Sequence, residues 1–136
     1  MTGDVVKIHP EETVAVAART LTHYNIGALP VCDHDGTLRG LVTDRDLVTR
    51  CIAQESRPEN TRVKDVMSPN VVCVRPEMDV SAAAAMMRRQ QIRRLPVVEN
   101  GKLCGMVSLG DLAKREDTNM EAAEALGGIC TNITRF

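Results

Sequence analysis

A hydroxyl and a carboxylate three residues apart follow a short apolar run at two places in this chain. The first place reads GLVTDRD at residues 40–46, and the second reads GMVSLGD at residues 105–111. Thr43 with Asp46, and Ser108 with Asp111, fit a capping box, in which the two side chains satisfy amides at the start of a helix. A carboxylate between the end of a strand and the start of a helix can also accept hydrogen bonds from ribose hydroxyls. The two motifs therefore predict either helix caps alone or caps that also bind a sugar.

The sequence predicts two copies of the elements that position these groups, because the chain is a tandem repeat. MTGDVVKIHPEETVAVAA at 1–18 aligns without gaps with MSPNVVCVRPEMDVSAAA at 67–84. The register continues from NIGALPV at 25–31 to QIRRLPV at 91–97, and LRGLVTDRDL at 38–47 matches LCGMVSLGDL at 103–112. A period of about 65 residues is too long for a solenoid unit and indicates two copies of a compact module.

Each copy predicts the order β-α-β-β-α, which places the chain in the α/β (more narrowly α+β) class. A short strand, Val5–Ile8 or 71–74, runs into a proline, and Thr13 and Asp79 are the expected N-caps of the helix that follows. Helical spacing predicts two buried faces, made of Val14, Ala17, Ala18 and Leu21 and of Val80, Ala83, Ala84 and Met87.

Two further strands in each copy are joined by turns that contain Asp35-Gly36 and Asn100-Gly101, which are strong hairpin signals. A second helix is expected to begin directly after Thr43 and after Ser108. The predicted organisation is a first repeat at 1–55, a polar linker at 56–65, a second repeat at 66–116 and a tail at 117–136. In the tail, Thr118-x-x-Glu121 predicts a capping box for a short helix that ends at Gly127-Gly128.

The composition narrows the classes of partner and compartment. With a net charge of −1, the chain has no broad electrostatic preference for nucleic acid or an anionic membrane. No apolar run approaches the ~20 residues that span a bilayer, and no signal segment is visible, so we expect a cytoplasmic protein. The aromatic residues are Tyr24 and Phe136, and so thin a core suggests that more apolar surface is buried in a homodimer.

Neither the cysteines nor the histidines indicate catalysis or a metal. The five cysteines contain no CxxC and are expected to be reduced thiols. His9, His23 and His34 have neither metal-ligand spacing nor a neighbouring nucleophile, and DHDG around His34 is expected to be a polar hairpin turn. The sequence therefore predicts a protein that is not an enzyme and has no metal site.

The order of these motifs, present twice, resembles a pair of cystathionine β-synthase (CBS) domains, the tandem unit called a Bateman module. The resemblance covers residues 1 to about 115, through the VVxxxP, xLPV and Ghx[TS]xxD motifs. It implies two repeats related by a pseudo-twofold axis and two clefts that commonly bind adenosine-containing ligands.

The resemblance to the gamma subunit of AMP-activated kinase implies how the clefts are lined. Each would take the hydroxyl and the aspartate from one repeat and the first strand from the other. One pocket would combine Leu41, Thr43 and Asp46 with Val71, Val72 and Ile92. The second pocket would combine Met106, Ser108 and Asp111 with Val5, Val6 and Ile26.

The same resemblance places Arg45, Arg93 and Arg94 near the phosphates of a nucleotide. The match is one-sided, because Gly27 and Ala28 stand where the second repeat has Arg93 and Arg94, and Gly110 stands at the equivalent of Arg45. We therefore expect one good nucleotide site, or a shared phosphate region around Arg94.

The function expected from the residues and the resemblance is a regulatory sensor of AMP, ADP, ATP or another adenosyl compound. It would need no obligatory cofactor, and it would act on a protein partner in trans. One alternative is a dimerisation or interaction scaffold whose clefts bind no ligand. DNA binding or an unrecognised enzymatic activity are further alternatives with less support.

Overall fold

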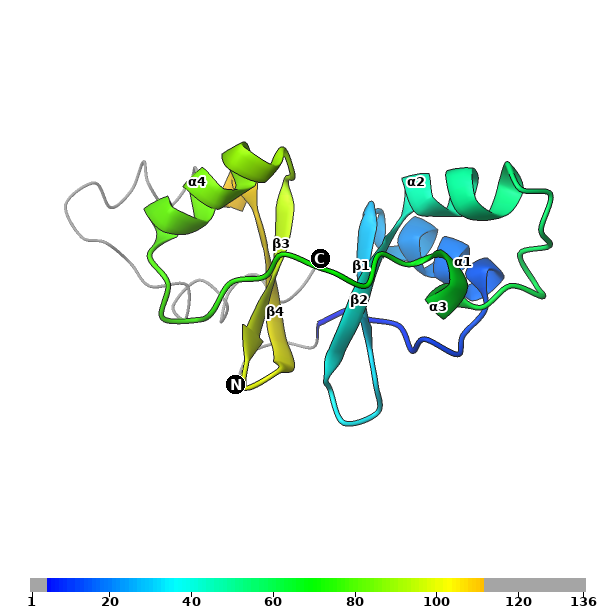
Figure 1. Ribbon diagram of the computed structural model, residues 1–136, viewed down its shortest axis with the longest axis horizontal. Helices are drawn as coiled ribbons and strands as arrows, with labels where there is room; N and C mark the ends of the chain where they lie inside the picture. Colours follow the sequence, from blue (N-terminus) through cyan, green and yellow to red (C-terminus); the bar gives the residue numbers. More distant parts are fainter. Residues whose placement is uncertain (1–4, 112–136) are drawn as a thin grey trace. The chain divides into compact units, whose positions relative to one another are not determined.

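The computed structural model describes residues 5–111 of the 136-residue chain, and it divides into two compact units (Figure 1). The first unit is Val6–Val71. The second unit, among the described residues, comprises 72–111 together with Val5. Among residues 5–111, no helix combines the length and the apolarity that crossing a membrane requires.

In the first unit, a strand pair carries a helix on either side of it in sequence. The elements are α1 (Val14–Tyr24), β1 (Ala28–Cys32), β2 (Leu38–Thr43), α2 (Asp44–Leu47), the π-helical turn η1 (Val48–Ile52) and α3 (Val63–Val66). β1 and β2 are antiparallel, with Ala28 opposite Thr43. Single bridges extend the pair on both edges, where Ile8 is parallel to Val31 and Leu41 is antiparallel to Ser68.

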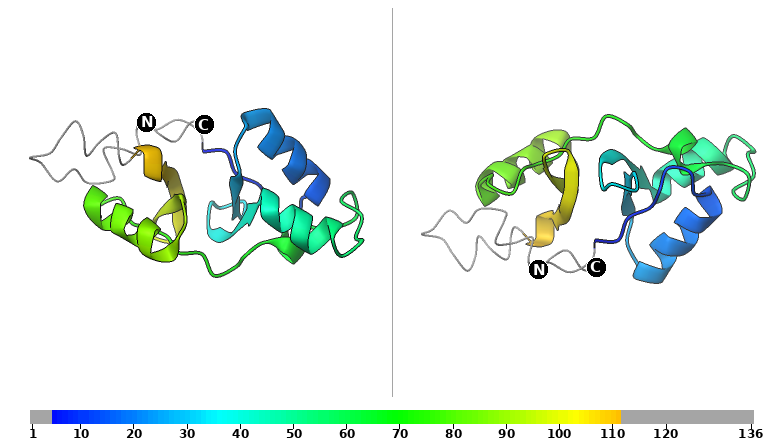
Figure 2. Two further views of the ribbon diagram at one scale, coloured as in Figure 1. Left: turned by 90° about the horizontal axis from the view of Figure 1, so that it is seen from above. Right: turned by 90° about the horizontal axis from the view of Figure 1, so that it is seen from below.

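The second unit repeats this arrangement with α4 (Val80–Gln90), β3 (Arg94–Glu99) and β4 (Lys102–Ser108). β3 and β4 are antiparallel, and Val74 forms a parallel bridge with Val97. A helix begins at 109, directly after Ser108, as α2 does after Thr43. Figure 2 shows α1 and α4 alongside the strand pair of their own units. The expected α+β class is confirmed, as are the two hairpins and the helix starts.

The first strand of each repeat is shorter than expected, because only Ile8 and Val74 pair with a neighbour. Ile8 donates to the Pro30 carbonyl and accepts from Cys32 N–H, at 3.0 and 2.9 Å. The next bond of a parallel ladder would need an N–H from Pro30, which proline lacks. Pro96 limits the pairing of Val74 in the same way. The proline of the xLPV motif therefore blocks the ladder before Ile8 and Val74, and Pro10 and Pro76 lack the N–H that would continue it beyond them.

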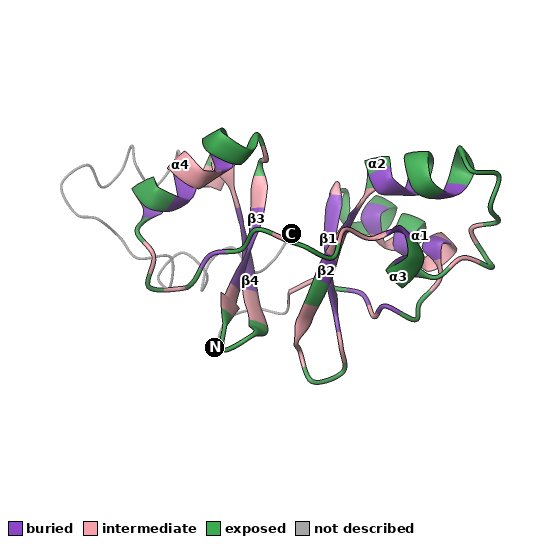
Figure 3. Cartoon of the chain, in the orientation of Figure 1, coloured by how far each residue is buried: buried purple, intermediate pink, exposed green. Residues whose placement is uncertain are grey.

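Each unit has its own apolar core, to which both its helices and its strands contribute buried residues (Figure 3). The expected face of α4 is confirmed, since Val80, Ala83, Ala84 and Met87 are all buried. In α1 the predicted face is wrong at Ala18, which is exposed, whereas Val14, Ala17 and Leu21 are buried. Ala18 lies at the margin of that face, whereas Ala84, its counterpart in the second repeat, is buried.

The ends of α1 and α4 show which expected caps are made. Thr13 Oγ1 accepts a hydrogen bond from Val16 N–H at 3.2 Å, so this N-cap is confirmed. Asp79 occupies the N-cap position of α4, but its side chain accepts no capping hydrogen bond. Both helices end at a residue in the left-handed region, Asn25 with φ 54° and Gln91 with φ 56°. The residue after each returns its N–H to the last turn, as in a Schellman motif.

The hairpin turns use the residues that the sequence indicated. Asn100 and Gly101 both have positive φ, 55° and 78°, as a two-residue type I′ turn requires. Gly36 has φ 90° in the longer turn of the first unit. The capping box expected at Thr118-x-x-Glu121 and the helix end at Gly127-Gly128 lie outside the described residues.

Candidate functional site

Thr43 and Asp46 form a complete capping box at the start of α2. Asp46 N–H donates to Thr43 Oγ1 at 3.1 Å, and Thr43 N–H donates to Asp46 Oδ2 at 3.0 Å. Asp46 is only 8% exposed, and it is the one buried charged residue among residues 5–111. The capping interpretation is therefore correct for this motif. The Asp46 carboxylate can accept further hydrogen bonds, because it has about four lone-pair positions and uses one of them in the box.

A backbone hydrogen bond joins the residue before β1 to the first residue of α2. Asp44 N–H donates to the Gly27 carbonyl at 3.1 Å, and in the second unit Leu109 N–H donates to the Arg93 carbonyl at 2.8 Å. These bonds occupy N–H groups at a helix start that have no partner within the helix. The hydroxyl and the carboxylate of each motif are thus held where a strand ends and a helix begins.

The second motif is bonded differently from the first. Asp111 N–H donates to Ser108 Oγ at 3.1 Å, while the Ser108 hydroxyl donates to Asp111 Oδ2 at 2.6 Å. In the first motif the carboxylate accepts from a backbone N–H instead. The Ser108 hydroxyl therefore donates its single proton to the hydrogen bond with Asp111, whereas Thr43 Oγ1 acts as an acceptor.

The arginines expected near the phosphates do not share one environment. Arg45 and Arg93 are exposed, and Arg94 is half-buried at the start of β3. Arg94 lies directly opposite Ser108 in the β3–β4 register, and side chains so placed are close neighbours. The structure thus brings Arg94 to the Ser108–Asp111 motif within one unit, which the spacing in the sequence did not indicate.

The apolar residues expected to line the pockets differ in exposure and are divided between the units. Leu41, Val6, Ile26 and Val71 are half-buried in the first unit, and Val5 and Ile92 are half-buried in the second. Met106 is 2% exposed, whereas Val72 is 36% exposed. The sharing of each pocket between two repeats stays a prediction.

Arg50 is a residue of this region that the sequence analysis missed. Its Nε lies 3.9 Å from Asp46 Oδ1. Its Nη1 donates to the carbonyls of Val66 and Met67 at 3.0 and 3.1 Å, and to Ser68 Oγ at 3.3 Å. The available signal was its position four residues after Asp46, where helical side chains meet.

The glycine of the GLVT motif has a structural role. A Cβ on Gly40 would lie 2.6 Å from the Ser68 carbonyl oxygen and 2.9 Å from Met67 Sδ. That space lets Ser68 pair with β2, where Leu41 N–H donates to Ser68 O at 3.0 Å and Ser68 N–H donates to Leu41 O at 2.9 Å. The glycine three residues before the hydroxyl is therefore explained by a close backbone approach.

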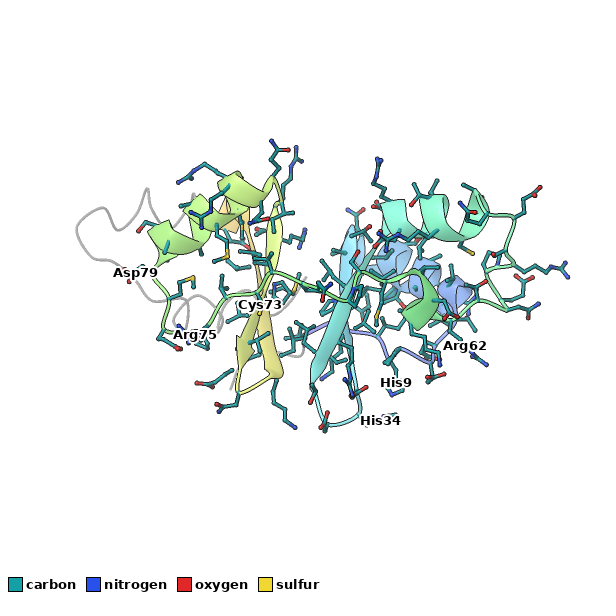
Figure 4. The ribbon with its side chains drawn as sticks, in the orientation of Figure 1. His9, His34, Arg62, Cys73, Arg75 and Asp79 are labelled. Atoms are coloured by element: carbon teal, nitrogen blue, oxygen red, sulfur yellow. The ribbon has the colours of Figure 1, made fainter. Side chains whose placement is uncertain are left out.

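The remaining titratable groups do not assemble a reactive centre among residues 5–111. The rings of His9 and His34 are stacked with centroids 4.1 Å apart (Figure 4), and His9 Nδ1 accepts from Glu11 N–H at 3.2 Å. No group of three or more His, Cys, Asp or Glu side chains in this part of the chain could hold a metal ion. Burial raises the pKa of the Cys32 thiol to about 11, which keeps it protonated and unreactive near neutral pH.

Comparisons with known proteins point to one family. A model of the CBS domain family matches residues 1–52 and 63–118. The CBS domain-containing protein YhcV of Bacillus subtilis is 41% identical over 129 residues, which are 95% of this chain and 91% of YhcV.

Solved structures agree with this similarity. A CBS-domain-containing protein from Agrobacterium tumefaciens has a TM-score of 0.72 at 35% identity, over 83% of this chain and 90% of that one. CBSX2, solved in complex with AMP, has a TM-score of 0.74 at 28% identity, over 86% of this chain and 90% of that one.

Proposed function

The chain belongs to the CBS-domain family, and we propose that it is a regulatory module that binds an adenosine-containing ligand. The ligand's ribose would bind the Asp46 carboxylate and the Thr43 hydroxyl. This site needs no metal and no catalytic group, and its role is to change the state of a protein partner rather than to transform a substrate.

The observation that carries this proposal is the position of the Asp46 carboxylate. Burial to 8% exposure and the bond from Thr43 N–H fix its orientation, while Oδ1 takes no part in the capping box. A pre-oriented acceptor loses little conformational entropy when it binds a ribose hydroxyl. A buried carboxylate at the junction of β2 and α2 thus has the chemistry and the rigidity that a sugar site needs.

The proposed ligand class is AMP, ADP, ATP or another adenosyl compound. The complex of the related CBSX2 with AMP supports this choice. Arg45 and Arg94 are the side chains we propose for the phosphates, with Arg94 beside Ser108 supporting a second, weaker site at Asp111. Leu41 and Val71 of the first unit are the apolar residues proposed to enclose the adenine of the first site.

We also propose that the protein is a cytoplasmic homodimer that acts on a partner in trans, without nucleic acid or membrane. Val48 and Ile52 are 58% and 55% exposed and lie four residues apart on η1. Large apolar side chains that share one exposed helix face support burial against a second copy. Sedimentation at several protein concentrations tests the oligomeric state.

A thermal-shift panel with AMP, ADP, ATP and S-adenosylmethionine tests the site on wild type, Asp46→Asn and Asp111→Asn. The asparagine oxygen can still accept the capping bond, so the variant removes the negative charge while it keeps the helix start. A ligand at ~100 times its dissociation constant adds about 2.7 kcal/mol to the free energy of unfolding. We expect that gain with one compound and its loss in Asp46→Asn.

Asp65→Asn is the matched control, because Asp65 is an exposed carboxylate in α3 of the same unit. Its ligand-induced shift should equal that of wild type. If no compound shifts wild type, the alternative of an interaction scaffold is favoured, since capping alone then accounts for Thr43 and Asp46.

A further inference from the structure

Arg50 joins two parts of the first unit that the capping box does not connect. One end of its guanidinium faces Asp46, with Nε 3.9 Å from Oδ1. The other end donates from Nη1 to Val66 O, Met67 O and Ser68 Oγ. A planar guanidinium with five donors in a fixed fork can serve both sides at once, which a point charge cannot.

The segment that Arg50 holds is a backbone neighbour of the candidate site. Ser68 exchanges two hydrogen bonds with Leu41, at 3.0 and 2.9 Å, and Gly40 leaves the room for this approach. Leu41 is proposed to enclose the adenine. Val71, which lies three residues after Ser68, is proposed to do the same. The position of the 66–68 segment therefore helps to set the positions of Leu41 and Val71 on the apolar side of the site.

Arg50 is placed by an irregular turn rather than by a continued α-helix. It lies in η1, where Ala53 N–H donates to Val48 O at 2.8 Å in the i→i+5 manner of a π-helix. Such turns are rare and occur often at functional sites. The Arg50 side chain is 47% exposed, so packing in the core does not force it into these contacts.

The sequence repeats this arginine in the second copy. DLVTR at 46–50 corresponds to DLAKR at 111–115, so that an arginine follows each motif aspartate by four residues. Arg115 lies outside the described residues. The same spacing in both copies indicates a role tied to the aspartate rather than to a chance surface contact.

We propose that Arg50 is a positioning residue that couples the Asp46 carboxylate to the 66–68 segment. It holds Oδ1 toward the site and fastens Ser68 against Leu41, so that ligand binding at Asp46 and ordering of the segment support each other. This coupling rests on the proposed function, because it concerns regulation of the same adenosyl site.

The test combines amide hydrogen exchange with ligand titration on the full chain. The variants are Arg50→Gln, which is neutral, and Arg50→Lys, which keeps the charge but cannot span both sides. The control is Arg57→Gln, because Arg57 is an exposed arginine of the same unit whose Nε forms an ion pair with Glu59 Oε1 at 3.2 Å. The probes are AMP and ATP.

Without ligand, we expect Arg50→Gln to speed exchange at the Leu41 and Ser68 amides by about fivefold or more, while the Ile26 amide in the same unit is unchanged. With ligand, its dissociation constant should rise roughly five- to tenfold, the range of a modest coupling between sites. Arg50→Lys should recover only part of both effects, and Arg57→Gln should match wild type.

Wild-type exchange and affinity in Arg50→Gln would overturn the inference and leave the proposed function standing. Full recovery of both by Arg50→Lys would overturn the bridging role, because a single ammonium would then suffice. A wild-type protein that binds neither AMP nor ATP would overturn the coupling to a nucleotide together with the proposed function. The exchange measurement without ligand separates the two failures, because it tests the effect of Arg50 on the Ser68 segment when no nucleotide is bound.

Discussion

The Ser108 hydroxyl donates a hydrogen bond to the Asp111 carboxylate at 2.6 Å, whereas Thr43 meets Asp46 through its backbone N–H at 3.0 Å. The two motifs look alike in sequence, yet only the first leaves its hydroxyl proton available to a ligand. This difference, together with the contact of Arg50 with Asp46, favours the first motif as the stronger site.

Removing the capping hydroxyl should weaken the start of α2. In Thr43→Val the Asp46 N–H loses its partner, and we expect the free energy of unfolding to fall by about 1 kcal/mol. Thr49→Val is the matched control, since Thr49 Oγ1 bonds the Arg45 carbonyl inside the helical segment and caps nothing. Urea denaturation of both variants measures the difference, and equal stabilities would contradict a capping role for Thr43.

Gly40 should not tolerate a side chain. In Gly40→Ala the new Cβ would lie 2.6 Å from the Ser68 oxygen, so β2 or the 67–68 segment must shift, at a cost of roughly 1–3 kcal/mol. In Gly110→Ala the nearest atom is Ser108 Oγ at 4.0 Å and the residue is helical. That change should stabilise by about 0.5–1 kcal/mol. Thermal unfolding of the pair gives the comparison, and a harmless Gly40→Ala would show that the close approach is not required.

Glycine should be favoured at the end of α4. Gln91 adopts φ 56°, and a left-handed residue with a Cβ costs roughly 1–2 kcal/mol. We therefore expect Gln91→Gly to raise the free energy of unfolding by about 1 kcal/mol. Asn25→Gly at the end of α1 is the control and should gain less, because asparagine adopts this conformation more readily. A larger gain at Asn25 than at Gln91 would oppose this explanation.

The buried Cys32 thiol should make stability sensitive to alkaline pH. Burial raises its pKa from 9.0 to about 11, an effect that Lys7 partly offsets. A raised pKa in the folded state means that the stabilisation is fully present below about pH 9 and is lost as the pH rises toward 11. We expect the free energy of unfolding to fall more steeply between these values in wild type than in Cys32→Ala. Cys73→Ser is the control, since Cys73 is exposed, and its slope should match wild type.

The sequence by itself determined the features that depend on neighbours a few residues apart. The tandem repeat, the Asn100-Gly101 turn, the Thr13 cap and the buried face of α4 all follow from local conformational preference and periodicity. The Thr43–Asp46 and Ser108–Asp111 pairs belong to this group, because a capping box closes within three residues.

Only the tertiary structure decided the features that depend on distant segments meeting. Pro30 limits a strand because Ile8 lies beside it, and Gly40 is needed because Ser68 approaches it. Arg50 reaches carbonyls 16 and 17 residues further along the chain. No periodicity encodes such contacts, since they arise from how packed elements bring backbone groups into range.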